Sequence, residues 1–383
     1  MGLIGKICGY PMGFIMWLIY SIVKNYGVSI IIFTLIVRLI LFPFSIKQQK
    51  STAALQALTP KLERLKKQYG NNQEKLNEET MKLYAEENIN PMSSCSTALI
   101  QFPFLFGIID VVYRPITHIL RVNKDVLARA TEIAKEYFVN EGNNFTSRPE
   151  LFIIKLFQTD PDKLAELPEL TSKLANFNNT IFGLDLGLVP QYAFDAEQKA
   201  LMGITPGQTV ALVLIPILSG LFQLIITIYS QIRMKKQNPD SASNPSMNSM
   251  NIMLYTMPLI SVFFAYSLPA GIGFYWIISS IVSLIQTIVL NKIYTPEYVA
   301  ELIKKDNAKK KNKPNMMQMM YQQQLEQMKA QGKLPESAKA DSEKKAQDIK
   351  LSKAKQKELE SKIIAEARRR QAEKYGDEYT DDE

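Results

Sequence analysis

The sequence is poor in the residues that build metal sites, disulfide frameworks and catalytic centres. Among 383 residues it has two cysteines, Cys8 and Cys95, and one histidine, His118. So few ligands cannot form a zinc site or a set of disulfides. A Ser-His-Asp triad would have to use His118, which has no recognisable motif around it. Phosphate-binding loops and dinucleotide fingerprints are also absent, so we expect neither an enzyme nor a metal site.

Charged residues are rare in several long apolar runs and gather instead in loops and in the tail. The mean hydropathy of −0.07 is typical of a soluble protein, but this average hides the segregation. A spanning helix needs about 20 largely apolar residues. Four runs fit this length, and a fifth fits apart from one internal arginine. Only Pro269, Ala270 and Gly271 separate the last two runs, which predicts a tight helical hairpin. The sequence therefore predicts an all-α polytopic membrane protein with spans at residues 28–45, 93–113, 209–231, 251–268 and 272–290.

The first 27 residues contain an apolar run that is interrupted by Gly9, Pro11 and Gly13. A cleaved signal peptide is one interpretation, but no small-residue cleavage pattern follows the run. Trp17 and its neighbouring tyrosines suit the headgroup region of a membrane. We therefore expect residues 1–27 to form an interfacial helix on the outer surface.

The basic residues of the short loops predict the orientation in the membrane. Residues 46–92 hold eight Lys and Arg, residues 232–250 hold three against one Asp, and the tail after Leu290 is rich in lysine. With five spans all three segments lie on one side, which the positive-inside rule assigns to the cytoplasm. We expect a multi-pass protein of a bacterial plasma membrane, with its N-terminus outside and its C-terminus in the cytoplasm. Residues 114–208 then lie outside.

Two segments between the spans have recognisable patterns. Residues 46–92 read as a charged helical hairpin, with leucines spaced by three and four and a turn at Gly70. This hairpin is either a solvated connector or a docking surface for cytosolic partners. The outer segment, residues 114–208, contains amphipathic stretches at 125–139 and 162–174, and we expect a small structural cap there.

The cytoplasmic tail, residues 291–383, begins with a cluster of lysines. Such a segment binds anionic lipid or RNA through phosphate charge, or it serves solubility and topology alone. The lysines of the partner-binding hypothesis are Lys304, Lys305, Lys309, Lys310, Lys311 and Lys313.

Arg38 lies within the first span, eleventh in an apolar run of 18 residues. An arginine at the bilayer centre costs about 2.5 to 3.5 kcal/mol on insertion scales. It must therefore face water, pair with an acid or extend to the membrane surface. Asp110 is the only acid within a predicted span, but it lies near the outer end of its helix, whereas Arg38 lies in the inner half of its own. A hydrated cavity open to the cytoplasm explains Arg38 best.

Polar and aromatic residues of the other spans can line this cavity. Each of them alone is more readily explained as a helix-packing residue, because Ser and Gln hydrogen-bond across membrane helices. Together with an unpaired arginine they indicate a groove. Its predicted lining consists of Gln101, Ser219, Gln223, Tyr275, Trp276, Ser279, Ser283 and Gln286.

Five segments of the predicted membrane core carry a family resemblance. They are IVRLILFPFSIKQQKS at 36–51, NINPMSSCSTALIQFPFLFGI at 88–108, IFGLDLG at 181–187, LIPILSG at 214–220 and MPLISVFFAYSLPAGIGFYWIISSIVSLIQ at 257–286. In this order, with a charged hairpin between the first two, they resemble the YidC/Oxa/Alb superfamily of membrane protein insertases, in the form found in Gram-positive bacteria.

The resemblance implies five helices around a hydrophilic groove that opens to the cytoplasm and is closed to the outside. Arg38 corresponds to the groove arginine, Trp276 to an aromatic groove residue, and Gln223 is the candidate for a groove glutamine. The implied function is insertion and folding of integral membrane proteins, alone or with the Sec translocon, without a bound cofactor. The implied partners are nascent membrane proteins, the Sec translocon, components of the ribosome and signal recognition particle pathway, and anionic lipid.

Two other functions stay open. A charged residue among polar neighbours also marks the substrate path of a transporter or channel, but no inverted repeat is visible among the spans and their outer ends are nearly uncharged. The third hypothesis is a membrane assembly scaffold, in which the tail matters and the groove does not. Truncation of the tail would distinguish a scaffold from an insertase.

Overall fold

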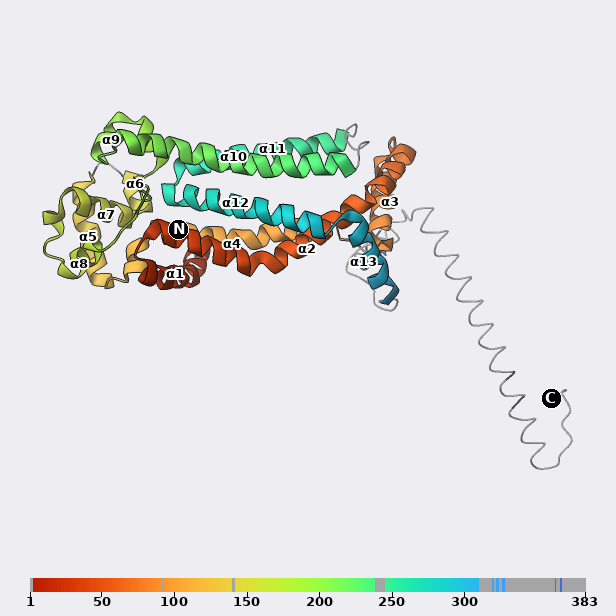
Figure 1. Cartoon of the computed structure of the whole chain (residues 1–383), viewed down its shortest axis with the longest axis horizontal. Coiled ribbons are helices and arrows are strands. Elements are labelled where there is room, and N and C mark those ends of the chain that lie inside the picture. Colours follow the sequence, from red (N-terminus) through yellow and green to blue (C-terminus); the bar gives the residue numbers. More distant parts are fainter. Residues whose placement is uncertain are drawn as a thin grey trace, which may run out of the picture. The chain divides into compact units, whose positions relative to one another are not determined.

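The computed structural model describes residues 3–87, 89–90, 93–139, 142–237 and 245–309, together with residues 319, 322–323, 326–327, 362 and 366. By its internal contacts the chain divides into two units, one of residues 1–80 and 89–311 and the other of residues 81–88 and 312–383. All the elements labelled in Figure 1, apart from the last residues of α3, belong to the first unit.

Helices make up most of the described chain. The long apolar helices are α1 (Leu3–Val23), α2 (Tyr26–Tyr69), α4 (Ser93–Tyr113), α10 (Pro206–Gln237), α11 (Pro245–Ser267) and α12 (Ala270–Ile293). Three further elements, next to these helices in the chain, are α3 (Gln73–Glu86), the π-helical turn η1 (Ile116–Leu120) and α13 (Pro296–Lys309). The elements between η1 and α10 are α5 (Lys124–Tyr137), α6 (Gly142–Ser147), α7 (Pro149–Thr159), η3 (Pro161–Leu164), α8 (Pro168–Ala175), β1 (Thr180–Ile181), β2 (Leu184–Asp185), η4 (Pro190–Phe194) and α9 (Ala196–Leu201).

The second helix, α2, joins two segments that the sequence pattern separates. The span predicted at 28–45 and the first arm of the predicted hairpin form one helix of 44 residues. The Asn25 side chain caps its start by accepting a hydrogen bond from a backbone amide of the first turn (3.0 Å). The helix continues through Pro43 and Pro60. The chain then turns at Gly70 and enters α3, so the predicted turn is confirmed.

Three helices, α2, α10 and α12, are long and apolar enough to cross a membrane. Among the described residues, α4 and α11 contribute shorter apolar stretches, at 101–113 and 258–267. A continuous exposed stripe on α10 consists of Val210, Leu214, Ile217, Leu221, Ile225, Ile228 and Ile232. Residues three and four apart share a helix face, and an exposed apolar face of this length is expected against hydrocarbon and not against water. The chain is therefore a multi-pass membrane protein, and the number of five spans stays a prediction.

Glycines set how closely the long helices approach one another. The helix α11 lies along α10, whereas α12 packs against α10 and α2 (Figure 1). A Cβ added at Gly220 of α10 would meet the Val262 side chain of α11, and one added at Gly273 of α12 would meet the Ile215 side chain of α10. Small residues are used in this way where membrane helices pack tightly. The sequence predicts α11 as the hairpin partner of α12. In the structure the main neighbour of α11 is α10.

The link between α11 and α12 is shorter than predicted. Ala270 and Gly271, which the sequence suggests as turn residues, are the first residues of α12, so only residues 268–269 connect the helices. The Ala270 amide donates to the Leu188 carbonyl (2.7 Å) and the Gly271 amide to the Leu186 carbonyl (2.9 Å). These backbone hydrogen bonds attach the start of α12 to the segment that follows the β1–β2 hairpin.

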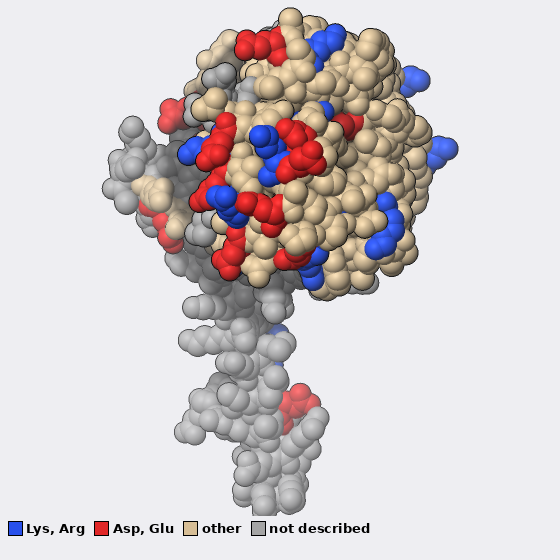
Figure 2. All heavy atoms as spheres, turned by 90° about the vertical axis from the view of Figure 1, so that its left-hand side faces the viewer, with Lys and Arg blue, Asp and Glu red and all other residues tan. Residues whose placement is uncertain are grey.

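Residues 114–208 fold into a small, mainly helical domain, the cap, at one end of the long helices (Figure 1). Its core includes the fully buried Ile153, Leu156, Leu164 and Leu170. The stretch predicted at 125–139 is α5, whereas the stretch at 162–174 divides into η3 and α8, with Pro168 opening the second helix. Acidic and basic side chains are interspersed on the surface of this end (Figure 2).

The first helix, α1, packs against α4 and η1 through two glycines. A Cβ at Gly9 would meet the Asp110 carboxylate, and one at Gly13 would meet the His118 ring. On the facing side, a Cβ at Gly107 of α4 would meet the side chain of Met12 at 2.7 Å. Gly9 and Gly13 form a G-x-x-x-G pattern, a known signal of close helix packing in membranes.

Candidate functional site

Arg38 lies on α2 next to the face that packs into the apolar core. Phe33, Val37 and Leu41 of that face are buried, whereas Arg38 is half-buried. Its guanidinium donates two hydrogen bonds to the Ser279 hydroxyl of α12, one from Nε at 3.1 Å and one from Nη2. The predicted groove arginine thus contacts a predicted groove serine from a helix 241 residues away in the sequence.

The polar residues of α12 form one face of that helix. Tyr275, Ser279 and Ser283 follow one another at intervals of four residues, and Gln286 lies in the next turn, so all four share a face. Tyr275 and Ser279 are buried at this face, with 2% and 4% of their surface exposed. Buried hydroxyls need hydrogen-bond partners, and Arg38 supplies one to Ser279.

Two glutamines link this face to neighbouring helices. Gln101 of α4 donates to the Tyr275 hydroxyl at 3.4 Å. The side-chain amide of Gln286 lies 3.5 Å from the backbone carbonyl oxygen of Arg38. Within the described part of the chain, no carboxylate lies within ion-pair distance of Arg38. The structure therefore brings together a cation, two hydroxyls and two amides from α2, α4 and α12.

Three other predicted groove residues have different surroundings. Ser219 is fully buried and donates to the Pro216 carbonyl of its own helix (2.9 Å). Gln223 accepts a hydrogen bond from Ser261 of α11 (2.7 Å). Trp276 packs against the apolar core. Sequence reasoning missed Ser261, because its role depends on the register between α10 and α11, which no local pattern reveals.

Asp110 lies in the last turn of α4 and has partners of its own. Its carboxylate pairs with Arg114 and lies 2.8 Å from Nε2 of His118. Burial lowers the pKa of His118 to about 4, so its ring is neutral at pH 7. This cluster is covered by α1 and serves helix packing, and Asp110 does not compensate the charge of Arg38.

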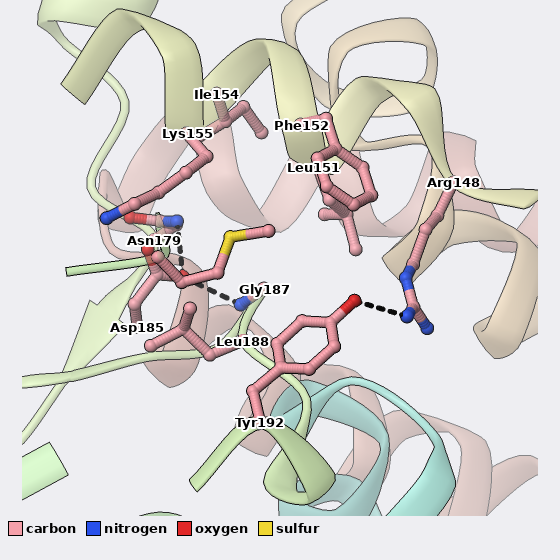
Figure 3. Close-up of a pocket in the computed structure, with 11 residues that line it drawn as sticks. Arg148, Leu151, Phe152, Ile154, Lys155, Asn179, Asp185, Gly187, Leu188 and Tyr192 are labelled. Carbon is pink, nitrogen blue, oxygen red and sulfur yellow. Dashed lines mark hydrogen bonds between the residues drawn. The ribbon is translucent and has the colours of Figure 1, made fainter. Parts of the chain in front are cut away.

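The cap encloses a small cavity lined by α7 and the β2–η4 segment (Figure 3). Asp185 there accepts hydrogen bonds from the Asn179 side chain (2.8 Å) and the Gly187 amide (2.7 Å), and Arg148 donates to the Tyr192 hydroxyl (2.6 Å). Burial raises the pKa of Asp185. The cavity has a volume of about 20 Å³, enough for a single water, so these residues serve the structure of the cap.

The lysines of the predicted partner-binding cluster are described only in part. Lys304 is exposed on α13, and Lys305 forms an ion pair with Glu301 one turn before it (2.7 Å). Lys309 is the last residue of α13. The other three, Lys310, Lys311 and Lys313, lie outside the described residues. Over the described ranges there is also no group of three or more His, Cys, Asp or Glu able to hold a metal ion.

Comparison with known proteins shows relatives over the same region. The membrane protein insertase YidC of Treponema denticola is 29% identical over 284 residues, which are 73% of this chain and 36% of that protein. The insertase YidC of Oceanobacillus iheyensis is 27% identical over 300 residues, 76% of this chain and 84% of that protein. The insertase YidC of Clostridium perfringens is 47% identical over 90 residues, 24% of this chain and 38% of that protein. The chain thus spans about a third of the length of the first relative and most of the second.

A family model gives the same result. The model described as 60Kd inner membrane protein matches residues 18–297. This range contains α2, α4, α10, α11 and α12, and with them Arg38 and the polar face of α12. The chain belongs to the 60Kd inner membrane protein family, which is the family of the YidC/Oxa/Alb insertases.

Proposed function

We propose that this chain inserts other proteins into a bacterial plasma membrane and assists their folding there. The observation that carries the proposal is Arg38, a cation in a spanning helix that is held by Ser279 and has no carboxylate partner among the described residues. The relatives that bear the name membrane protein insertase support the same function. The substrates are nascent integral membrane proteins.

The chemistry of the site suits a polar segment in transit. A substrate carboxylate that moves into the bilayer loses hydration, and this loss is the main barrier to its transfer. Arg38 offers such a carboxylate a charge-assisted hydrogen bond. The half-buried Gln101 and Gln286 offer neutral donors and acceptors for the substrate backbone. A hydrated groove, open to the cytoplasm, avoids complete desolvation of either partner.

The apolar part of the substrate needs a different path. The exposed stripe on α10 and the exposed Leu259 and Phe263 of α11 present apolar surface at the sides of the long helices. A hydrophobic substrate helix gains free energy by moving along such a surface into the bilayer. In this scheme the polar segment enters the groove while the apolar helix leaves toward lipid.

The proposal includes an orientation and a set of partners. Residues 46–92 and the tail, which are rich in Lys and Arg, lie in the cytoplasm, and the N-terminus and the cap lie outside. These basic cytoplasmic segments bind the partners, which are the Sec translocon, the ribosome, the signal recognition particle pathway and anionic lipid.

The test is a depletion-rescue assay with a single-span client that has a short acidic outer tail. Wild type is compared with Arg38→Lys and Arg38→Ala. We expect Arg38→Lys to retain insertion. Arg38→Ala should lower the amount of inserted client at least about tenfold, because one lost charge contact of about 1.5 to 3 kcal/mol corresponds to a tenfold effect or more. The matched control is the same client with its tail acids replaced by Gln, for which Arg38→Ala should behave like wild type.

Two outcomes would contradict parts of this proposal. Full rescue of the acidic client by Arg38→Ala would show that the charge is not required. Failure of the wild-type chain to rescue any client would contradict the insertase function itself.

A further inference from the structure

The helix α1 has an apolar stripe that the rest of the described chain leaves largely exposed. Between 49% and 77% of the surface of each residue in the stripe is exposed. The stripe consists of Ile7, Tyr10, Phe14, Leu18 and Ile22. They follow one another at intervals of three and four residues and so share one face. The opposite face, which includes the fully buried Met16, packs against α4 and η1. In a membrane protein such a stripe lies against lipid.

The stripe borders an open groove between α1, η1 and α8. This groove, here named the α1 groove, has a volume of about 660 Å³ and is lined by residues that include Trp17, Tyr20, Lys24, Leu120, Lys173 and Asn176. Its size is within the range of about 300 to 1,000 Å³ that small-molecule sites occupy. The apolar stripe and the α1 groove therefore lie next to each other along one side of α1.

A stacked arginine lies next to the α1 groove. The guanidinium carbon of Arg121 lies 3.8 Å from the centre of the Trp17 ring and 5.5 Å from the centre of the Phe14 ring. Stacking of this kind holds a guanidinium in place and leaves its N–H donors free at the edge. Trp17 thus connects the cation to the groove, and Phe14 connects it to the apolar stripe.

The two cations Lys24 and Arg121 lack carboxylate partners in the described part of the chain. Two other cations of the cap have carboxylate partners, since Arg129 bonds Glu166 (2.8 Å) and Lys173 bonds Glu169 (2.9 Å). The surface view shows the same mixture of acidic and basic side chains on the cap (Figure 2). An anionic ligand would therefore find two uncompensated positive charges beside the α1 groove.

The backbone at these cations is also unusual. Lys24 has φ 56° and Arg121 has φ 49°, in the left-handed region that favours Gly and Asn. They are two of the three non-glycine residues with positive φ among the described residues. A residue with a Cβ has a backbone cost at such a position, so the fold holds both cations at strained positions next to the α1 groove.

We propose that the α1 groove binds one anionic phospholipid of the surrounding bilayer. The headgroup phosphate lies between Lys24 and Arg121, and the acyl chains follow the stripe through Phe14, Leu18 and Ile22. A lipid is the occupant that matches both halves of the surface, because it joins an anion to a long apolar chain. Such a lipid fixes the depth of α1 at the membrane surface next to the cap.

Trp17 makes the site observable. The chain has two tryptophans, so in the Trp276→Phe background Trp17 is the only one. The full chain is reconstituted in phosphatidylcholine bilayers that contain an equal fraction of either brominated phosphatidylglycerol or brominated phosphatidylcholine. Bromine quenches a tryptophan that it contacts, and the ratio of the two quenching constants measures the preference for the anionic lipid.

We expect phosphatidylglycerol to be preferred, and each removed charge to lower the preference about five-fold. The variants are Lys24→Asn and Arg121→Asn, because Asn tolerates left-handed backbone while it lacks the charge. Lys24→Asn is the sharper of the two, since it keeps the stack of Arg121 on Trp17. The control with equal net charge is the pair Lys135→Gln and Lys163→Gln, at exposed positions elsewhere on the cap.

Several results would overturn the site. One is an unchanged preference in the variant that carries both Asn substitutions while thermal unfolding shows it to be folded. Another is an equal loss of preference in the Lys135 and Lys163 control, which would indicate a general charge effect. A third is the absence of any preference for phosphatidylglycerol while soluble glycerol phosphate alone shifts the Trp17 emission, which would show that the site holds a free phosphate compound and not a lipid.

Discussion

Ionisable side chains inside this molecule differ in the partners that the fold provides, and these partners decide what each can do. Asp110 has Arg114 and His118, and Glu150 has the amide and hydroxyl of Thr117. Arg38 has the hydroxyl of Ser279. A hydroxyl orients a guanidinium without neutralising it. Under the proposed function Arg38 therefore keeps its charge for a substrate, whereas the carboxylates hold the structure together.

A prediction at this scale concerns Glu150, which is 3% exposed and accepts hydrogen bonds from the Thr117 amide (2.9 Å) and hydroxyl (2.5 Å). Burial raises the pKa of this carboxyl above its ordinary value of 4.5. The folded chain then holds the proton to a higher pH than the unfolded chain. The free energy of unfolding therefore contains a contribution that is complete below pH 4.5 and is lost as the pH rises through the folded pKa.

Glu150→Gln removes this pH dependence, because the amide does not titrate, while its oxygen accepts from the Thr117 amide and its NH2 group donates to the Thr117 hydroxyl. We expect the variant to gain stability relative to wild type as the pH is raised from about 4 to about 7, by roughly 1.4 kcal/mol for each unit of raised pKa. Thermal unfolding in detergent at several pH values measures this difference. The exposed Glu136→Gln is the control, and a Glu150→Gln effect of the same size at every pH would contradict the prediction.

At the scale of the elements, close packing depends on glycines that face a bulky neighbour. Gly9 and Gly13 bring α1 against Asp110 and His118, and Gly273 brings α12 against α10. Each approach is possible because the glycine has no Cβ. The long helices of the site are thus positioned by small residues outside the site.

Gly13→Leu tests this packing. The added side chain collides with the His118 ring, and overpacking of this kind costs about 1 to 3 kcal/mol. We expect a lower Tm and faster maleimide labelling of Cys8, which lies on α1, measured in a Cys95→Ser background. Gly207→Ala is the control, because a Cβ at that position meets nothing within 4 Å. Unchanged labelling in Gly13→Leu would mean that α1 does not depend on this contact.

At the scale of the whole molecule, one apolar core extends from the long helices into the cap. It includes Phe33 of α2, Val111 of α4, Leu156 of α7 and Leu212 of α10. The backbone hydrogen bonds between residues 186–188 and the start of α12 add a second connection. This core lies within the first unit, and residues 312–383 belong to the second.

A chain that ends at Lys311 should therefore keep the thermal stability of the first unit. We expect the free energy of unfolding to change by about 0.5 kcal/mol or less, the range of ordinary surface changes, so that Tm stays nearly the same. We also expect retained insertion of a client that needs only the groove. Thermal unfolding and the depletion-rescue assay measure the two quantities. Loss of all insertion at normal Tm would favour a scaffold in which the tail does the work.

The sequence by itself determined the class of the molecule and singled out Arg38 and the polar face of α12. Long apolar runs predict spanning helices because lipid leaves no other partner for their backbone. The cost of a buried charge singles out Arg38, and the spacing of Tyr275, Ser279 and Ser283 predicts one polar face because the helical repeat is fixed. The turn at Gly70 was likewise predictable from the local sequence.

Only the tertiary structure decided which of these residues meet. The contact of Arg38 with Ser279, the pairing of Gln223 with Ser261 and the placement of α11 along α10 depend on helix register and on glycine contacts between distant segments. The α1 groove is a further example, since Trp17 and Arg121 come from separate parts of the chain. Such contacts are set by the packing of the whole core, and local periodicity carries no information about them.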